Sequence, residues 1–264
     1  MVMAQTLVVK LGGRMLEAPG ATFSLAAELH TIEPCVLVHG GGPEVTEWCA
    51  RLGLTARFED GQRVTDESTM DVVAAVLAGL GNKRLVALLR GQGIDAVGLS
   101  ALDGGMVEVE PHADAEKLGA VAQVRSVNPA LLETLLEAGQ VPVLSSVAAY
   151  QGRLFNLNAD TLAAALAAAL GATLVILSDV PGLILDGEVV PRLAAENIAQ
   201  TLAGPGVEGG MRPKLRAART ALEGGAGRVH IAPWSGRGTL AALKTDHPGG
   251  TIVEAGLATA NGRG

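Results

Sequence analysis

Val36-Leu37-Val38-His39-Gly40-Gly41-Gly42-Pro43 joins an apolar run to three glycines and then to a helical pattern over Pro43–Leu52. An apolar run without polar alternation is typical of a strand buried on both faces, as in parallel sheets covered by helices. Three successive glycines exceed what one tight turn needs, and N–H groups without a neighbouring Cβ can approach an anion closely. The segment predicts a strand, an anion-binding turn and a helix. It leaves His39 open as a structural or a catalytic residue.

The same alternation of strand-like and helical segments runs along the chain. The expected strands are Leu7–Lys10, Val36–His39, Ile94–Leu99, Val141–Ser145, Leu174–Ser178 and Val229–Ala232. The expected helices are Pro43–Leu52, Asp66–Leu80, Lys83–Gly91, Pro129–Ala138, Asn158–Leu170 and Met211–Leu222. This order predicts an α/β fold, namely a three-layer αβα sandwich with a mostly parallel central sheet.

Two glycine turns interrupt the alternation. Asp60-Gly61 and Asp103-Gly104-Gly105 both have the pattern of hairpin turns, and hairpins inserted into such a fold often cover a ligand. The chain becomes richer in Gly and Pro after Gly171. We therefore expect an N-terminal lobe over residues 1–170 and a C-terminal lobe over residues 171–264.

Composition limits the class of protein. With 264 residues, 48% of them hydrophobic and 2% aromatic, the chain can bury a large core of Ala, Val and Leu. Its formal net charge of −7 argues against nucleic acid or an acidic membrane as a partner. Cys35 and Cys49 are too few for a disulfide framework and favour a cytoplasmic location. The apolar window Leu162–Leu177 contains Gly171 and is shorter than the roughly 20 residues of a membrane span, so we expect no membrane segment.

Several common site motifs are absent from the sequence. It has no Gly-x4-Gly-Lys-Ser/Thr P-loop and no His-Glu-x2-His zinc pattern, and its five histidines are scattered, so we expect no metal held by the protein itself. Gly204-Pro205-Gly206-Val207-Glu208-Gly209 has the spacing of a dinucleotide-binding loop, but it follows a helical stretch instead of a strand. A dehydrogenase is therefore disfavoured.

Three charged residues conflict with their local surroundings. Lys10 ends an otherwise apolar strand, where an unpaired ammonium group is costly to bury, and Gly12 and Gly13 follow at once. Asp160 lies in the first turn of an Ala-rich helix, and Lys214 lies near the start of another, where a cation is unfavourable for the helix dipole. Such conflicts are expected at functional sites, and these residue types suit a transferring phosphoryl group.

Eight segments occur in an order that resembles the amino acid kinase family, most closely its members that act on N-acetyl-L-glutamate. They are Lys10-Leu11-Gly12-Gly13, His39-Gly40-Gly41-Gly42-Pro43, Gly61-Gln62-Arg63-Val64-Thr65, Asn82-Lys83, Val97-Gly98-Leu99, Asn156-Leu157-Asn158-Ala159-Asp160, Leu177-Ser178-Asp179-Val180-Pro181-Gly182-Leu183 and Gly210-Met211-Arg212-Pro213-Lys214. The resemblance covers nearly the whole chain. It implies an enzyme that uses ATP and Mg²⁺ to phosphorylate the side-chain carboxylate of N-acetyl-L-glutamate, giving N-acetyl-L-glutamyl 5-phosphate in arginine biosynthesis.

The resemblance also implies roles for individual residues. Two lysines would stabilise charge on the phosphoryl group, an aspartate would organise the lysines, and glycines would supply N–H donors: Lys10, Lys214, Asp160, Gly12, Gly13, Gly41 and Gly42. Arg63 and Asn156 would grip the amino-acid substrate, although an arginine in a hairpin is more often a solvated surface group. Ser178 and Asp179 would lie in a loop that contacts the nucleotide. Magnesium would bind mainly through the ATP phosphates.

The same resemblance implies how the lobes and subunits are used. The N-terminal lobe would bind acetylglutamate and form the dimer interface, and the C-terminal lobe would bind MgATP. The first strand begins within a few residues of Met1, where arginine-inhibited, ring-forming relatives carry an additional helix. We therefore expect a homodimer without arginine feedback.

Two alternatives stay open at this point. Arg14 after the double glycine and Ala122 in Val121-Ala122-Gln123-Val124 are unusual, which leaves the acyl substrate in doubt. The closest competing substrate is a carrier-protein-linked aminoadipate of lysine biosynthesis, although the acidic net charge would repel an acidic carrier. The other alternative is a catalytically silent amino-acid or nucleotide sensor, which would have no need for both lysines and Asp160.

Overall fold

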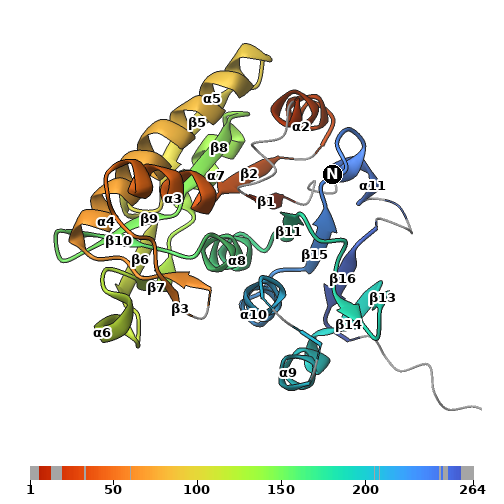
Figure 1. The fold of residues 1–264 in the computed structure, drawn as a ribbon. Coiled ribbons are helices and arrows are strands. Elements are labelled where there is room, and N and C mark those ends of the chain that lie inside the picture. The colour runs from red at the N-terminus through yellow and green to blue at the C-terminus, as the bar shows by residue number, and fades with distance from the viewer. Residues whose placement is uncertain are drawn as a thin grey trace, which may run out of the picture.

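The computed structural model describes residues 6–12, 20–32, 34–59, 61–204, 206–207, 209–243, 245 and 249–256. Its centre is an eight-stranded sheet in the order β14-β16-β15-β11-β1-β2-β8-β5 (Figure 1). The strands are β1 (Leu7–Leu11), β2 (Cys35–His39), β5 (Ala96–Ser100), β8 (Val141–Ser145), β11 (Thr173–Ser178), β14 (Arg192–Ala194), β15 (Arg228–Pro233) and β16 (Thr251–Glu254). Neighbouring strands run parallel except β15 and β16, which confirms the predicted mostly parallel sheet.

Helices cover both faces of this sheet, because successive strand residues point to opposite sides (Figure 1). On one face, Val9 and Leu37 pack in a cluster with side chains of α2 (Ala21–Leu29), α5 (Asn82–Gly91) and α11 (Thr239–Ala242). On the other face, Val8 and Val38 pack with α7 (Ala130–Glu137), α8 (Ala159–Ala169), α9 (Ile198–Ala203) and α10 (Met211–Glu223). The predicted three-layer αβα sandwich is therefore confirmed.

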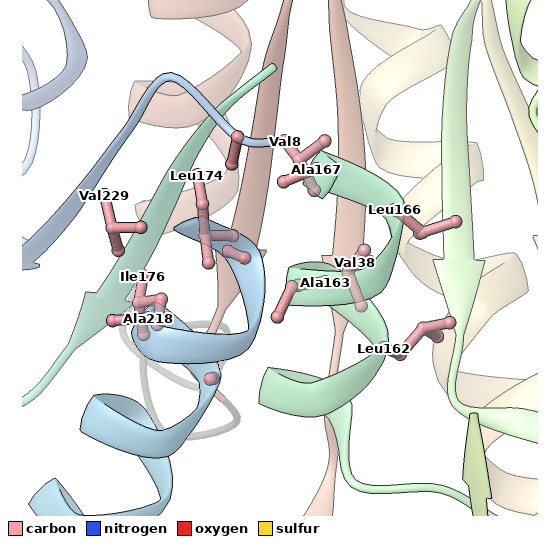
Figure 2. Packing of buried hydrophobic residues seen from close by; sticks show 14 of the residues in the cluster. Val8, Val38, Leu162, Ala163, Leu166, Ala167, Leu174, Ile176, Ala218 and Val229 are labelled. Carbon is pink, nitrogen blue, oxygen red and sulfur yellow. The ribbon is translucent and has the colours of Figure 1, made fainter. Parts of the chain in front are cut away.

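Helix α8 lies at the centre of the second face. Its Leu162, Ala163, Leu166 and Ala167 are fully buried, and Figure 2 shows them beside side chains of β1, β2, β11, β15 and α10. Alanines permit this crowding because a small side chain lets a helix approach both a sheet and another helix. Asn158 caps the helix as predicted, since its Oδ1 accepts hydrogen bonds from the backbone N–H groups of Asp160 and Thr161.

One helical stretch of the described chain, Glu67–Gly91, is long and apolar enough by length and composition to cross a membrane. It joins α4 (Glu67–Val73), the π-helix η1 (Ala74–Gly81) and α5 directly, so the predicted interruption before Lys83 is wrong. The expected most apolar window, Leu162–Leu177, instead divides into α8 and β11. The Glu67–Gly91 stretch contributes Met70, Val73, Leu85 and Leu89, among others, to two buried clusters, as a core helix of a globular protein does.

The described residues also form two-stranded sheets that are separate from the central one. Gly61 lies in the turn between β3 (Phe58–Glu59) and β4 (Gln62–Arg63), as predicted, and Asp60 lies outside the described residues. The second predicted hairpin is wrong, because the 3₁₀ turn η2 (Asp103–Gly105) leads from the edge strand β5 to β6 (Val107–Pro111), and β6 pairs with β7 (Ala122–Val127). Local turn residues do not specify which distant strand becomes the partner.

The remaining elements connect or flank these layers. They are α3 (Gly42–Arg51), α6 (Ala115–Leu118), β9 (Val147–Tyr150), β10 (Arg153–Asn156), β12 (Ile184–Leu185), β13 (Glu188–Val189) and the 3₁₀ turn η3 (Ala195–Asn197). The central sheet continues across Gly171, since β11 pairs with β1. The division into lobes at residues 170 and 171 stays a prediction.

Candidate functional site

The ends of three neighbouring strands place the predicted loops side by side. Strand β1 lies between β2 and β11, and all three run in the same direction. In this register Lys10 lies opposite Val38 and Ile176, one residue before the carboxyl end of β1. The loops that begin at Gly12, Gly40 and Asp179 therefore meet at the carboxyl edge of the sheet, where α/β proteins usually bind their ligands.

Three charged side chains from distant parts of the chain meet at this edge. The Nζ atom of Lys10 lies 2.9 Å from Oδ1 of Asp160, and the Nζ atom of Lys214 lies 3.9 Å from Oδ2 of the same carboxylate. The Lys10 and Asp160 side chains are 11% and 8% exposed, and that of Lys214 is 12% exposed. Two largely buried ammonium groups thus share one carboxylate, and these three groups by themselves carry a net charge of about +1.

Lys214 is the more loosely held of the two lysines. It lies in the first turn of α10, and its Nζ also donates a hydrogen bond of 3.2 Å to the carbonyl oxygen of Gly210. Burial lowers the pKa of Lys214, with a smaller contribution from the positive charge of Lys10, while Asp160 and Asp179 oppose the shift. An anionic ligand beside this ammonium group would offset the cost of burying it.

The glycine loops leave room for such a ligand. Gly41 is the N-cap of α3 without a side-chain cap, so the first N–H groups of this helix have no partner of that kind. A Cβ at Gly41 would lie 2.6 Å from Cδ2 of Leu77, and one at Gly12 would lie 3.2 Å from the Leu177 carbonyl oxygen. Gly13, which was predicted to donate a hydrogen bond, lies outside the described residues, as does Arg14.

A cavity of about 180 Å³ adjoins the glycine loop. It brings together residues that the sequence predicted for the acceptor, namely Gly41, Gly42, Arg63 and Asn156. It also contains Phe58, Val121 and Ser146, among others, which sequence reasoning did not assign to a site. Apolar walls with a few convergent polar groups are typical of a small-molecule site.

Arg63 is buried at the wall of this cavity, so the interpretation as a solvated surface residue is wrong. It is 7% exposed, and its Nη2 donates to the Gly42 carbonyl oxygen at 2.8 Å and to Oγ1 of Thr46 at 2.7 Å. Its guanidinium carbon lies 4.7 Å from the centre of the Phe58 ring. Within the described chain its buried Nη1 has no hydrogen-bond partner, which suits an anionic ligand in the cavity.

Asn156 reaches the same wall from β10. Its Nδ2 lies 3.3 Å from Oγ1 of Thr65, whose hydroxyl donates to the Arg63 carbonyl oxygen at 2.8 Å. Thr65 is fully buried and links the two predicted substrate residues. The amide oxygen and the remaining amide proton of Asn156 can then serve a ligand.

Ser178 is the last residue of strand β11, and Asp179 follows it in the loop. The Ser178 hydroxyl donates to Asp179 at 3.3 Å and accepts a hydrogen bond of 3.4 Å from the Val180 N–H. No group of three or more His, Cys, Asp or Glu side chains within the described residues could hold a metal ion. Two ammonium groups and the N–H groups at the start of α3, which no side chain caps, suit phosphate oxygens, and Mg²⁺ needs few protein ligands when phosphates supply the oxygens.

Comparisons with known proteins identify the family of this chain. The model of the amino acid kinase family matches residues 5–233. The acetylglutamate kinase of Geobacillus kaustophilus is 42% identical over 257 residues, which cover 95% of this chain and 97% of that protein. The acetylglutamate kinase of Methanopyrus kandleri is 44% identical over 248 residues, which cover 88% and 98%.

Solved structures share the fold. The N-acetylglutamate synthase from Neisseria gonorrhoeae, in complex with coenzyme A and N-acetyl-glutamate, is 29% identical with a TM-score of 0.83, and the match covers 96% of this chain and 60% of that one. Carbamate kinase from Giardia is 16% identical with a TM-score of 0.70 over 96% of this chain and 99% of that one, which shows the fold alone. The chain belongs to the amino acid kinase family, and it is an enzyme of that family.

Proposed function

We propose that this chain transfers the terminal phosphoryl group of ATP to the side-chain carboxylate of N-acetyl-L-glutamate, which forms N-acetyl-L-glutamyl 5-phosphate in arginine biosynthesis. The observation that carries the proposal is that Lys10 and Lys214 share the single carboxylate of Asp160. They lie beside a cavity where Nη1 of Arg63 has no hydrogen-bond partner among the described residues. Relatives named acetylglutamate kinase, at 42% and 44% identity over most of the chain, support the same reaction.

On the acceptor side, Arg63 and Asn156 would hold the substrate. An arginine that is already buried, stacked on Phe58 and bonded to Gly42 and Thr46 presents its free nitrogen in a fixed direction. A carboxylate of the acceptor would accept from this nitrogen, and the amide of Asn156 would bind the acceptor's polar groups. The apolar part of the cavity would receive the acetyl group.

The chemistry needs positive charge more than it needs a base. A free carboxyl side chain has a pKa near 4.3, so at neutral pH the attacking group is already deprotonated. The chain must therefore bring two anions together, which Lys10, Lys214 and the N–H groups of the glycine loop would do. Bound Mg²⁺ would screen further phosphate charge. Asp160 would keep the two ammonium groups apart and aimed at the site.

We also infer that a C-terminal lobe begins at residue 171 and that MgATP binds through Lys10, Gly12, Ser178, Asp179 and Lys214. We infer a cytoplasmic location as well, because both buried cysteines are free. The N-terminal lobe would form a homodimer through the Glu67–Gly91 stretch beside the edge strand β5. Leu88 on this stretch is 47% exposed. Light scattering should find a dimer that Leu88→Glu weakens. The control Leu52→Glu changes an exposed leucine at the C-cap of α3 and should leave the dimer intact.

The test of the reaction is ADP release that depends on the acceptor. The purified chain with MgATP should release ADP with N-acetyl-L-glutamate, and hydroxylamine should trap the acyl phosphate as a hydroxamate. L-Glutamate, N-acetyl-L-aspartate and N-acetyl-L-aminoadipate, all without a carrier protein, serve as matched acceptors. Equal or greater turnover with one of these would refute the assignment of substrate. No acceptor-dependent ADP release with any of them, from a folded chain that binds ATP, would instead support a sensor.

A further inference from the structure

Two buried polar side chains lie directly behind the glycine loop. Asn82 is fully buried and His39 is 1% exposed, and neither has been assigned a part in the reaction. Gly40 and Gly41 line both the acceptor cavity and a second cavity of about 340 Å³. Because there is open space on two sides of these glycines, packing alone does not hold the loop in one orientation.

The hydrogen bonds of Asn82 fix the direction of its amide. The Nδ2 atom lies 2.9 Å from the Val143 carbonyl oxygen and 3.3 Å from the Leu99 carbonyl oxygen, and both of these atoms can only accept. The Oδ1 atom lies 3.1 Å from the ammonium group of Lys83, which can only donate. The amide nitrogen therefore faces the two carbonyl groups, and the alternative flipped orientation is excluded.

The direction of this amide decides the tautomer of His39. The Asn82 Nδ2 atom also lies 3.1 Å from His39 Nε2, so Nε2 must be the unprotonated acceptor. The proton then resides on Nδ1, which donates a hydrogen bond of 2.9 Å to the Gly40 carbonyl oxygen. Burial lowers the pKa of His39 and so favours this neutral form.

The neighbouring elements are shaped to receive Asn82. It begins α5 directly after the π-helix η1, and π-helical segments shift the side chains that follow them and are frequent at functional sites. Opposite Asn82 on β5, a Cβ at Gly98 would collide with the amide oxygen and would lie 2.7 Å from Nζ of Lys83. The absence of a side chain at Gly98 and the π-helix before Asn82 thus both allow the Asn82 amide to pack against β5.

We propose that His39 and Asn82 are positioning residues, which hold the Gly40–Gly41 peptide so that its N–H points toward the transferring phosphoryl group. In a trans peptide the C=O and the N–H point in opposite directions, so a hydrogen bond that anchors the Gly40 oxygen also aims the Gly41 N–H. The inference rests on the proposed function. It assigns to the pair an effect on the rate of phosphoryl transfer, and not merely on folding.

Two isosteric substitutions separate the two nitrogens of the ring. In His39→Asn the side-chain amide nitrogen can replace Nδ1 and keep the bond to Gly40, whereas in His39→Gln the amide can replace Nε2 and keep only the contact with Asn82. We expect kcat to fall by about 100-fold in His39→Gln and by less than about fivefold in His39→Asn, because loss of a preorganised donor typically costs on the order of 10²–10³. Asn82→Ala should lower kcat by about tenfold. The KM for MgATP should stay within about threefold in all three.

The matched control is His230→Asn, which replaces a buried histidine on β15 of the same sheet. It should lower the thermal midpoint without lowering kcat. Equal kcat losses in His39→Asn and His39→Gln, or kcat near the wild-type value in folded His39→Gln, would overturn the proposal.

A spectroscopic measurement keeps this inference separate from the proposed function. The imidazole ¹⁵N signals of His39 in the wild-type chain should show a protonated Nδ1 and an unprotonated Nε2 at neutral pH, with or without substrates. A protonated Nε2 would overturn the positioning role whatever the acceptor is. The wild-type chain could instead show the expected tautomer but no acceptor-dependent ADP release. The proposed function would then be refuted, while the hydrogen-bond geometry of His39 would be confirmed.

Discussion

Lys10 and Lys214 contact the same carboxylate, but the chain holds them in different ways. Lys10 lies within a strand that is hydrogen-bonded on both sides to parallel neighbours, and its ammonium group is 2.9 Å from Asp160. Lys214 lies in the first turn of a helix, 3.9 Å from Asp160, with a bond to the carbonyl oxygen of Gly210 in its own helix. The difference indicates that the strand side of the site is preorganised, while the helix side depends more on the ligand for its final contacts.

The largest effect is expected at the strand. Lys10→Ala should lower kcat by on the order of 10³ or more, because it removes a preorganised charge and leaves Asp160 with one distant partner. Steady-state ADP release at saturating substrates measures this loss. Lys117→Ala, at an exposed lysine, is the control. Turnover of folded Lys10→Ala within a factor of ten of the wild type would contradict the role.

A somewhat smaller effect is expected at the helix. Lys214→Ala should lower kcat by on the order of 10² and raise the KM for MgATP, since this lysine stabilises the phosphoryl group once the nucleotide is bound. Removing it also removes the cost of burying an ammonium group, which is the main cause of its lowered pKa. The apo chain should therefore unfold in urea at the wild-type concentration or a higher one. If Lys214→Ala destabilised the apo chain toward urea more than Lys10→Ala does, Lys214 would be the more preorganised of the two lysines, which would contradict the comparison.

The unfolding free energy should decrease at acidic pH because of one buried histidine, His230. Burial lowers the pKa of His230 on β15 from 6.5 to about 4, with Arg228 and Arg192 adding to the shift and Glu254 opposing it. Below about pH 6.5 the His230 side chain is protonated in the unfolded chain but stays neutral in the folded chain. The unfolding free energy therefore decreases as the pH falls from 6.5 toward 4. The loss should reach about 2 kcal/mol at pH 5.

His230→Asn should remove this loss. Urea unfolding of both chains at pH 7 and pH 5 measures the effect as a difference between the wild type and the variant. The stability gap between them should narrow by about 2 kcal/mol at the lower pH. A stability gap that does not change between pH 7 and pH 5 would show that folding does not lower the pKa of His230.

The acceptor wall should respond in KM more than in kcat. Arg63→Lys keeps the charge but loses the planar fork that contacts Gly42, Thr46 and the free side of the cavity together. We expect the KM for N-acetyl-L-glutamate to rise by about tenfold to thirtyfold, with kcat within about threefold. Arg84→Lys, at an exposed arginine paired with Glu44, is the control. If only the KM for MgATP changed, Arg63 would contact the nucleotide and not the acceptor, which would contradict the assignment.

The smallest effect is expected where α2 meets α11. The buried carboxylate of Glu28 accepts hydrogen bonds from the backbone N–H groups of Gly238, Leu240 (2.8 Å) and Ala241 (3.0 Å). Glu28→Gln turns an NH₂ group toward these donors and should cost about 1 kcal/mol of unfolding free energy. Glu47→Gln, in an exposed ion pair with Arg51, should cost less than about 0.5 kcal/mol. Equal losses of unfolding free energy in the two variants would show that the Glu28 carboxylate stabilises the fold no more than an exposed ion pair does.

Much of this site could be predicted from the sequence because its residues break local rules. A lysine in an apolar strand and a lysine at the start of a helix are conspicuous, and Lys10 and Lys214 do meet at Asp160. The regular parts of the fold were also predictable, since β1, β2, β8, β11 and β15 are apolar runs bounded by turns.

The rest depends on partners that are distant in sequence. Asn82 lies between the two expected helices Asp66–Leu80 and Lys83–Gly91, and only the folded structure, with its π-helix, shows the contact of Asn82 with His39. The burial of Arg63 depends on its hydrogen bonds to Gly42 and Thr46 of α3, which are about 20 residues away in the sequence. Likewise, nothing near η2 indicates that β6 pairs with β7. Local propensity specifies elements, whereas burial is decided by the tertiary fold.

The most direct test is a crystal structure of the chain with a non-hydrolysable ATP analogue, Mg²⁺ and N-acetyl-L-glutamate. The account predicts that the Nζ atoms of Lys10 and Lys214 both contact oxygens of the terminal phosphate, with Asp160 still between them and the acceptor carboxylate in line. A structure in which either ammonium group points away from that phosphate would contradict it.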